Sequence, residues 1–121
     1  MKITVPLKKN YEFMRAFNKG KFFVGKYLVL YVIPNNMKIN RLGITTSKKV
    51  GKSVARNRFR RLIRESYRTW EDFLMIGYDL VFVARKNEKL PTLFDVSKEM
   101  KYLFKRLNLF DQEKWDCSKQ F

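Results

Sequence analysis

Arginine is concentrated between residues 53 and 70, at intervals that match the turns of an α-helix. On a helix that advances by about 100° per residue, five arginines and one asparagine share a single arc. They are Arg56, Asn57, Arg60, Arg61, Arg64 and Arg68. Phe59, Ile63 and Trp70 lie on the opposite side, so that side predicts a contact with the core. A guanidinium binds phosphate oxygens through paired hydrogen bonds and stacks on bases, so the arc predicts a surface that binds nucleic acid.

The charges of this segment have one sign, whereas a helix face that is only solvated mixes signs so that residues four apart attract. Glu65 is the only acid between residues 53 and 70, and Arg56, Arg60 and Arg64 repel one another at that spacing. Three lysines also precede the helix, where free backbone N–H groups favour an anion. They are Lys48, Lys49 and Lys52. This stretch therefore predicts an anionic partner.

Arg58 falls between the basic arc and the core-facing side of the same helix. Two arrangements fit that position. Its guanidinium can bind the same nucleic acid as the arc, or its aliphatic stem can lie along the core with the charge paired to an acid. The sequence does not choose between them.

The whole chain is strongly basic. Its 121 residues carry 27 Lys and Arg against 11 Asp and Glu, a formal net charge of +16, which predicts a polyanionic partner. An anionic membrane is the weaker candidate because arginine forks suit phosphates and bases, so we expect no membrane partner. No apolar run approaches the roughly 18 residues of a membrane span, and Met1 to Leu7 lacks the apolar centre of a signal peptide. We therefore expect a cytoplasmic protein.

Residue types for catalysis by the protein itself are scarce. The chain has no histidine and a single cysteine, Cys117, which excludes histidine-dependent triads, intrachain disulfides and thiolate metal clusters. The remaining candidates are carboxylates without the spacing of a two-metal centre. They are Glu12, Asp72, Asp79, Glu88 and Asp95. We expect no catalytic and no metal-binding residue, and a metal-dependent nuclease acting alone is an alternative.

Hydrophobic patterns predict the elements that position the basic helix. Residues 10–19 predict a short helix with Asn10 as its N-cap and with Phe13 and Phe17 one turn apart on one face. Residues 21–33 are rich in β-formers, and both alternating sets of side chains are apolar. This strand should therefore be covered on both faces.

The rest of the chain continues as alternating strands and helices. Pro34 to Asn36 predicts a turn, and residues 41–46 predict a second strand that forms a hairpin with the first. Later elements are the basic helix with Ser53 as N-cap, a buried strand over residues 78–84, a helix opened by Thr92 and Asp95, and a frayed tail over residues 111–121. This order predicts one α+β domain, residues 1–121, around a single sheet.

Several short motifs stand in order along the chain. They are Leu7-Lys8-Lys9-Asn10, Leu28-Val29-Leu30-Tyr31, Ser47-Lys48-Lys49-Val50-Gly51, Ala55-Arg56-Asn57-Arg58, Arg60-Arg61-Leu62-Ile63-Arg64 and Val83-Ala84-Arg85. In sequence and spacing, over roughly residues 7–107, they closely resemble the signature of the bacterial ribonuclease P protein family. The resemblance implies a single-domain α-β-β-β-α-β-α sandwich, similar to a ribosomal-protein domain, with a left-handed βαβ crossover.

The resemblance also implies a role. Proteins of this family partner a large catalytic RNA in an endoribonuclease that removes the 5′ leader of precursor tRNA, and metal ions held largely by the RNA carry out the cleavage. We therefore expect ribonuclease P RNA and precursor tRNA as partners, no DNA, magnesium in the holoenzyme and no cofactor bound by the protein alone. A ribosomal-protein-like module that binds structured RNA without a role in cleavage is the alternative.

Two RNA-binding surfaces follow from the positions that match the family. The surface for the catalytic RNA comprises Lys48, Lys49, Lys52, Arg56, Asn57, Arg58, Arg60, Arg61 and Arg64, and the helical wheel adds Arg68. A cleft for the single-stranded leader, between the first helix and the sheet, comprises Phe13, Phe17, Val29 and Tyr31, with Lys9, Arg15 and Arg41 as nearby cations. Taken without the resemblance, Phe13 and Phe17 are more often plain core residues.

Overall fold

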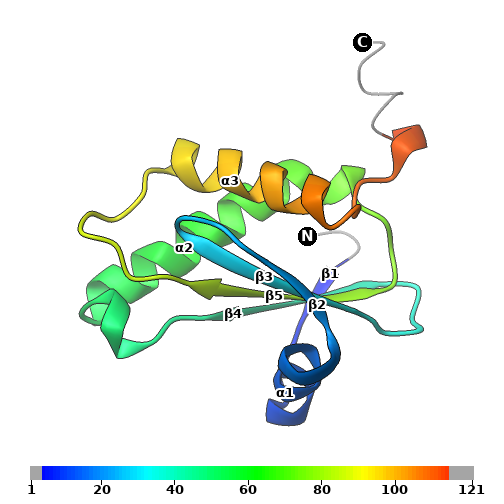
Figure 1. Ribbon diagram of the computed structural model, residues 1–121, viewed down its shortest axis with the longest axis horizontal. Helices are drawn as coiled ribbons and strands as arrows, with labels where there is room; N and C mark the ends of the chain where they lie inside the picture. Colours follow the sequence, from blue (N-terminus) through cyan, green and yellow to red (C-terminus); the bar gives the residue numbers. More distant parts are fainter. Residues whose placement is uncertain (1–3, 115–121) are drawn as a thin grey trace.

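The computed structural model describes residues 4–114 as one five-stranded sheet with helices on both faces (Figure 1). The strands are β1 (Thr4–Pro6), β2 (Lys21–Val24), β3 (Leu28–Pro34), β4 (Asn40–Thr45) and β5 (Tyr78–Ala84). The helices are α1 (Asn10–Lys19), α2 (Ser53–Trp70) and α3 (Leu93–Arg106), with short 3-10 turns η1 (Lys48–Val50) and η2 (Glu71–Phe73). The predicted α+β fold around one sheet is confirmed, and β1 is an additional strand that the sequence patterns missed.

The strands lie in the order β1-β4-β5-β3-β2 across the sheet. β5 pairs antiparallel with β3 and parallel with β4, so the predicted hairpin between the strands on either side of Pro34 to Asn36 is wrong. β5 occupies the centre because it is apolar on both faces, and because Asp79 near its start binds both Asn35 and Arg41. The β4–α2–β5 segment is the parallel crossover, whose left hand stays a prediction.

The β-rich segment over residues 21–33 forms two strands instead of one. β2 and β3 pair as an antiparallel hairpin, and the carboxylate of Glu99 on α3 holds the turn between them. It accepts hydrogen bonds from the backbone N–H groups of Lys26, Tyr27 and Leu28, at 2.6, 2.8 and 2.7 Å. The alternation of apolar residues could not reveal this turn, because the carboxylate that fixes it lies more than 70 residues away along the chain.

The main core lies between the sheet and the pair of helices α2 and α3 (Figure 1). Leu28 and Leu30 point into it from β3, and Phe59, Ile63 and Tyr67 meet them from α2. The core-facing side predicted for the basic helix is therefore confirmed. Burial raises the pKa of Tyr67 to about 12, although a hydrogen bond of 2.7 Å to the hydroxyl of Thr4 opposes that rise.

A second, smaller core explains why β3 is apolar on both faces. It lies between the sheet and α1, and its buried members are Leu7, Ala16, Ile33 and Val81. Phe13, Phe17 and Tyr31 pack against it while staying partly exposed. α1 crosses only part of this face (Figure 1). The predicted covering of both faces of β3 is therefore confirmed at Ile33, whereas Val29 is only half-buried.

The helix ends agree with the sequence only in part. Thr92 and Asp95 form the predicted capping box, with hydrogen bonds of 3.2 and 3.0 Å, and these bonds to Thr92 lower the pKa of Asp95. Asn10 and Ser53 are the first helical residues and not the predicted N-caps.

The chain stays attached to the core beyond α3. The backbone N–H of Asp111 donates to the carbonyl of Phe73 at 2.8 Å, so the predicted fraying does not begin at residue 111. Residues 115–121 of the predicted tail, which include Cys117, lie outside the described residues. None of the helices between residues 4 and 114 combines the length and the apolar character needed to cross a membrane.

Candidate nucleic-acid interface

The arginine arc of α2 lies on the outside of the molecule. Arg61, Arg64 and Arg68 are exposed, and Arg56 and Arg60 are half-buried. The opposite side of the helix holds Phe59 and Ile63, which are almost completely buried. One helix thus anchors itself in the main core and presents its cations outward, as the helical period predicts.

Most guanidinium groups of the arc keep their charge available. Arg56 donates to the hydroxyl of Ser53 at 3.1 Å, and Arg60 donates to the side-chain oxygen of Asn57 at 3.2 Å. Both acceptors are neutral, so they orient the guanidinium groups without cancelling their charge. Among residues 4–114 the Nε of Arg56 is one of the few buried side-chain donors or acceptors without a hydrogen-bond partner.

Arg68 differs from the rest of the arc because it forms an ion pair with Glu65 at 2.8 Å. Both side chains are about half exposed, so the pair is screened and weak, yet it reduces the positive potential at the end of α2. Arg68 is therefore the weakest candidate of the arc.

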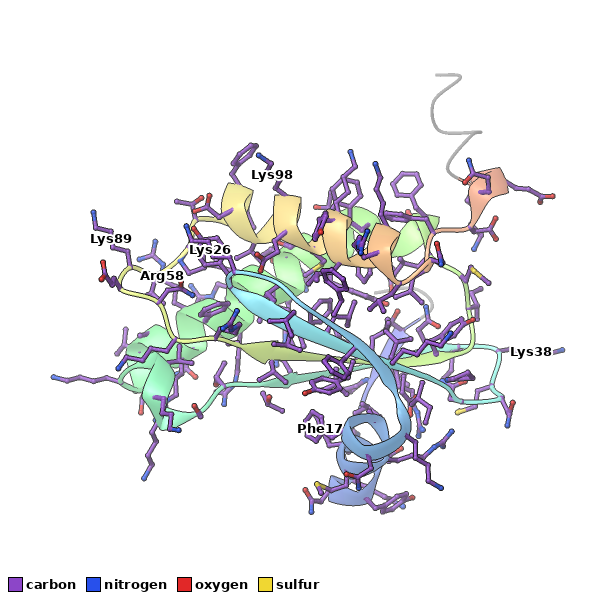
Figure 2. All side chains as sticks on the ribbon, in the orientation of Figure 1. Phe17, Lys26, Lys38, Arg58, Lys89 and Lys98 are labelled. Carbon is purple, nitrogen blue, oxygen red and sulfur yellow. The ribbon has the colours of Figure 1, made fainter. Side chains whose placement is uncertain are left out.

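Arg58 is exposed, which does not fit the arrangement with its aliphatic stem along the core. Figure 2 labels Arg58 on α2. It lines a hollow on the flank of this helix with Asn57, Arg61, Val54 and Leu62. No salt bridge of Arg58 is found among the described residues. Its charge therefore adds to that of the arc within the part of the chain that the structure describes.

The three lysines before α2 are exposed and lie in the segment that connects β4 to α2. Lys48 and Lys49 belong to the turn η1, and Lys52 stands directly before the first helical residue. Gly51 has φ of 149°, a conformation that L side chains rarely adopt, so a glycine is needed to redirect the chain from η1 into α2. This turn joins the lysines and the arginine arc into one continuous basic surface.

The predicted leader cleft lies on the opposite face of the sheet, beside α1. Phe17 meets Tyr31 edge to face, with ring centroids 5.0 Å apart and planes at 79°. The ring of Phe13 packs closely against Gly43 of β4. A Cβ at position 43 would come within 2.5 Å of this ring, so a glycine is needed there to accommodate Phe13. Phe13, Phe17 and Tyr31 pack against the small core and are half-buried, so each also keeps part of its surface accessible. The core and cleft roles of Phe13 and Phe17 are therefore compatible.

Residues missed by the sequence patterns extend the cleft beyond α1. Phe22 and Val24 on β2 lie opposite Tyr31 and Val29 of β3, and opposite residues of an antiparallel pair share a face. Both are exposed, and Val83 of β5, which pairs with Val29, is half-buried. The signal for Phe22 was present as a large apolar residue beside a turn, but Phe22 and Phe23 could not be assigned to faces without the pairing of β2.

Arg41 is not a free cation of the cleft, which corrects the prediction made for it. Its guanidinium donates to both carboxylate oxygens of Asp79, each at 2.7 Å, and to the carboxylate of Glu12. Asp79 is fully buried, and its hydrogen bond raises the pKa of Arg41 further. The two carboxylates thus neutralise the charge of Arg41. Its side chain has a structural role, because it connects α1 and β5 to β4.

Lys9 and Arg15 keep their positive charge near α1. Lys9 is exposed before the helix, with its ammonium 5.7 Å from the ring centre of Tyr11. Arg15 is exposed and donates to the carbonyl of Pro34 at 2.7 Å. Pro34 is the last residue of β3, whereas Val29 lies near the start of this strand. Arg15 and Val29 therefore lie at opposite ends of the cleft.

Most residues of both surfaces come from one acid-free stretch of the chain. Residues 13–64 contain 14 Lys and Arg and neither Asp nor Glu. This stretch runs from α1 through β2, β3 and β4 into the arginine arc of α2. Its positive charges therefore lie on both sides of the sheet, and such an excess favours a polyanion.

The carboxylates considered for a nuclease centre are mostly engaged elsewhere. Glu12 and Asp79 bind Arg41, and Asp95 caps α3. Among the described residues no group of three or more His, Cys, Asp or Glu is placed to hold a metal ion.

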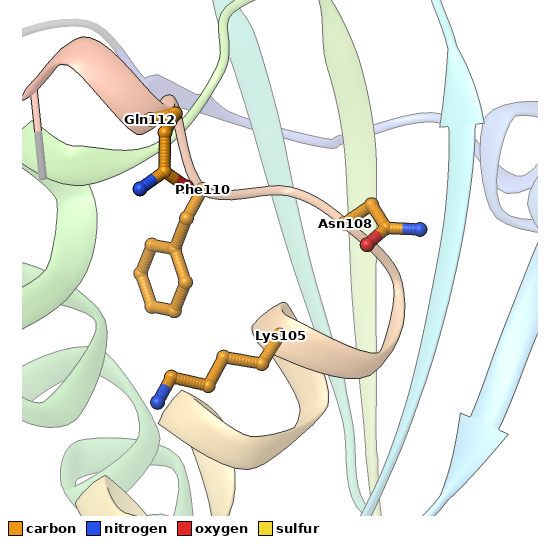
Figure 3. Close-up of a pocket in the computed structure, with 4 residues that line it drawn as sticks. All are labelled: Lys105, Asn108, Phe110 and Gln112. Atoms are coloured by element: carbon orange, nitrogen blue, oxygen red, sulfur yellow. The ribbon is translucent and has the colours of Figure 1, made fainter.

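A hollow beyond the end of α3 belongs to neither surface. It is lined by Lys105, Asn108, Phe110 and Gln112 (Figure 3). The ring of Phe110 lies 6.1 Å from Trp70 and 5.7 Å from Phe104, so it belongs to the aromatic packing under the helix ends. The hollow is on the α2 and α3 side of the sheet, away from the cleft.

The chain is similar in sequence to proteins of one family. The sequence model of the family described as Ribonuclease P matches residues 1–108. A ribonuclease P protein component from Clostridium kluyveri is 46% identical over 106 residues, which cover 86% of this chain and 95% of that protein. A ribonuclease P protein component from Clostridioides difficile is 45% identical over 107 residues, 88% of this chain and 94% of that protein.

Solved structures show the same similarity. The RNase P protein of Staphylococcus aureus superposes with a TM-score of 0.79 at 30% identity, over 88% of this chain and 97% of that chain. The RNase P protein of Thermotoga maritima superposes with a TM-score of 0.74 at 30% identity, over 84% of this chain and 96% of that chain.

Proposed function

The chain belongs to the ribonuclease P protein family, and from this membership we propose that it is the protein subunit of a ribonucleoprotein that removes the 5′ leader of precursor tRNA. In this role it is an accessory subunit of an endoribonuclease. Its partners are a ribonuclease P RNA and precursor tRNA, and it acts by binding and orienting them.

The continuous basic surface of η1 and α2 is proposed to bind the catalytic RNA. The observation that carries this proposal is the one-signed arc. Among residues 4–114, Arg56 and Arg60 bond to neutral side chains, and Arg58, Arg61 and Arg64 are exposed. Phosphates relieve the repulsion between these arginines, because each guanidinium can bind two oxygens. Release of counterions from the RNA adds to the affinity and makes it depend on salt.

The aromatic cleft is proposed to hold the single-stranded leader. Unpaired bases stack on aromatic side chains, and nearby cations follow the phosphate backbone. Phe17 and Tyr31 form the aromatic part, Val29 extends it along β3, and Lys9 and Arg15 supply the charge. A duplex cannot use such a surface in this way, because its bases are already stacked. The cleft therefore favours a precursor that carries a leader over mature tRNA.

In this proposal the catalytic RNA, and not the protein, carries out the cleavage. Magnesium bound largely to the RNA would supply the metal-ion chemistry of the cleavage. The protein contributes affinity and orientation, which require no titrating side chain at neutral pH.

Reconstitution tests the proposal. Precursor tRNA cleavage by a ribonuclease P RNA is measured at low magnesium with and without this chain, and the chain is expected to increase the rate. Equal rates would contradict the subunit role and favour an RNA-binding module without a part in cleavage. Cleavage by the chain alone, after nuclease treatment has removed co-purifying RNA, would instead support a protein nuclease.

A further inference from the structure

Phe22 on β2 presents an exposed aromatic ring beside the leader cleft. Its exposed fraction is 56%, which is high for a phenylalanine within a sheet. The ring stacks on Tyr31, with centroids 5.3 Å apart and planes only 29° from parallel. Tyr31 in turn meets the edge of Phe17. Three rings from α1, β3 and β2 thus form a row that ends at an accessible surface of Phe22.

We propose that Phe22 is a further base-stacking position, which binds an unpaired base of the single-stranded leader. This inference rests on the proposed function of the cleft and deepens it. A base that packs against the accessible side of Phe22 extends the row of rings by one member. Since every base has an aromatic face, such a position adds affinity for single strands with little preference for sequence.

The position of Phe22 is fixed before any ligand binds. Glu99 holds the turn after β2 through three backbone N–H groups, and Arg85 donates to the carbonyl of Gly25 in that turn at 2.6 Å. On the other face of β2, Phe23 packs edge to face on Tyr102 and lies under the guanidinium of Arg106, which is 4.8 Å from the ring centre. A ring held in this way loses little conformational entropy when a base stacks on it.

The charges around β2 favour nucleic acid as the occupant. Lys19 and Lys21 precede Phe22, Lys26 follows it, and all three lysines are exposed. β2 also lies within the acid-free stretch of residues 13–64. A second copy of this chain would bring the same positive surface and be repelled, whereas a phosphate backbone is attracted.

The test measures binding of precursor tRNA to the holoenzyme reconstituted from the full chain and a ribonuclease P RNA. Two precursors are compared, one with a long leader and one with a truncated leader. Phe22→Leu keeps an apolar side chain on β2 but removes the ring, so it is expected to weaken binding of the long-leader precursor by about five- to tenfold. Binding of the truncated precursor is expected to stay unchanged, and Phe22→Trp is expected to keep wild-type affinity for both.

Phe94→Leu is the matched control, because Phe94 is 73% exposed but lies on α3, across the sheet from the cleft. A fluorescent base analogue placed at successive leader positions should be quenched at one position more in the wild type than in Phe22→Leu. Equal binding by Phe22→Leu and Phe94→Leu would overturn the inference, as would equal losses with both precursors. A change in oligomeric state caused by Phe22→Leu would overturn it in favour of a contact between copies. If the wild type itself does not distinguish the two precursors, the proposed function of the cleft fails instead.

Discussion

The arginine arc of α2 and the aromatic cleft beside α1 are built in opposite ways. The arc comes from one helix, and its members are set by the helical period, with Phe59 and Ile63 buried behind them. The cleft needs α1, β2 and β3 together, and Phe13 and Phe17 serve the small core as well. A charged surface can thus be added to a fold with little change to its core. An aromatic surface has to be shared with the packing that supports it.

This comparison predicts that the cleft side is the more sensitive to single substitutions in its support. Arg41→Ala leaves the buried carboxylate of Asp79 without its main partner, and breaking a buried ion pair in this way costs about 3–5 kcal/mol. We expect the free energy of unfolding, measured with urea, to fall by that amount. Arg15→Ala is the control, since this exposed arginine donates to the neutral carbonyl of Pro34, and it should cost less than about 1 kcal/mol. Similar small losses for both variants would show that Arg41 is not a structural group.

Loss of two arginines should affect binding but not folding. Combined Arg60→Ala and Arg64→Ala is expected to weaken binding of the catalytic RNA by about 2–3 kcal/mol, on the order of 100-fold, because charge-assisted bonds to phosphates are lost. The dependence of affinity on salt, measured by titration at several salt concentrations, should become shallower. Lys38→Ala, in the turn before β4 (Figure 2), is the matched control and should change neither quantity. An unchanged salt dependence in the double variant would show that the arc does not contact phosphates of the RNA.

The aromatic rings should control which tRNA is preferred. Phe17→Ala and Tyr31→Ala are each expected to weaken binding of a precursor with a leader by about 1–2 kcal/mol, the contribution of a stacked base. Binding of mature tRNA should change much less. Because Phe17 also packs on the small core, its variant should in addition unfold at a lower temperature. Equal losses for precursor and mature tRNA would refute the cleft assignment.

Arg68 should have the smallest effect. Its ion pair with Glu65 already satisfies part of its charge, so Arg68→Ala is expected to weaken binding of the catalytic RNA by less than about 0.5 kcal/mol. Glu65→Gln frees the guanidinium and should increase the affinity by a similar amount. A loss in Arg68→Ala as large as that in Arg64→Ala would place Arg68 among the principal contacts.

The sequence predicts the arc better than the cleft, for physical reasons. The arc depends on the spacing of residues within one helix, so periodicity alone places Arg56, Arg60 and Arg64 on its outer side. Arg41 looked like a cation of the cleft because its partners are distant in sequence, 29 residues to Glu12 and 38 residues to Asp79. A basic residue in a strand does not reveal whether an acid from another strand lies beside it.

The order of the strands in the sheet was also not predictable from the sequence. Turn residues after β3 predicted that β3 and β4 are neighbours, yet the doubly apolar β5 inserts between them. Side chains on two faces can be sorted by alternation, but the order of strands depends on contacts between distant segments. The position of Phe22 beside Tyr31 has the same origin, because it follows from the register of β2 against β3.

Site-specific crosslinking tests the central claim, that the two surfaces bind two different RNA molecules. Arg61→Cys and Val29→Cys, each combined with Cys117→Ser, are labelled with a photoreactive group and assembled with a ribonuclease P RNA and precursor tRNA. Our account predicts that the probe at position 61 crosslinks to the catalytic RNA and the probe at position 29 to the leader of the precursor. Crosslinks from both positions to the same RNA, or an exchange of the two targets, would contradict it.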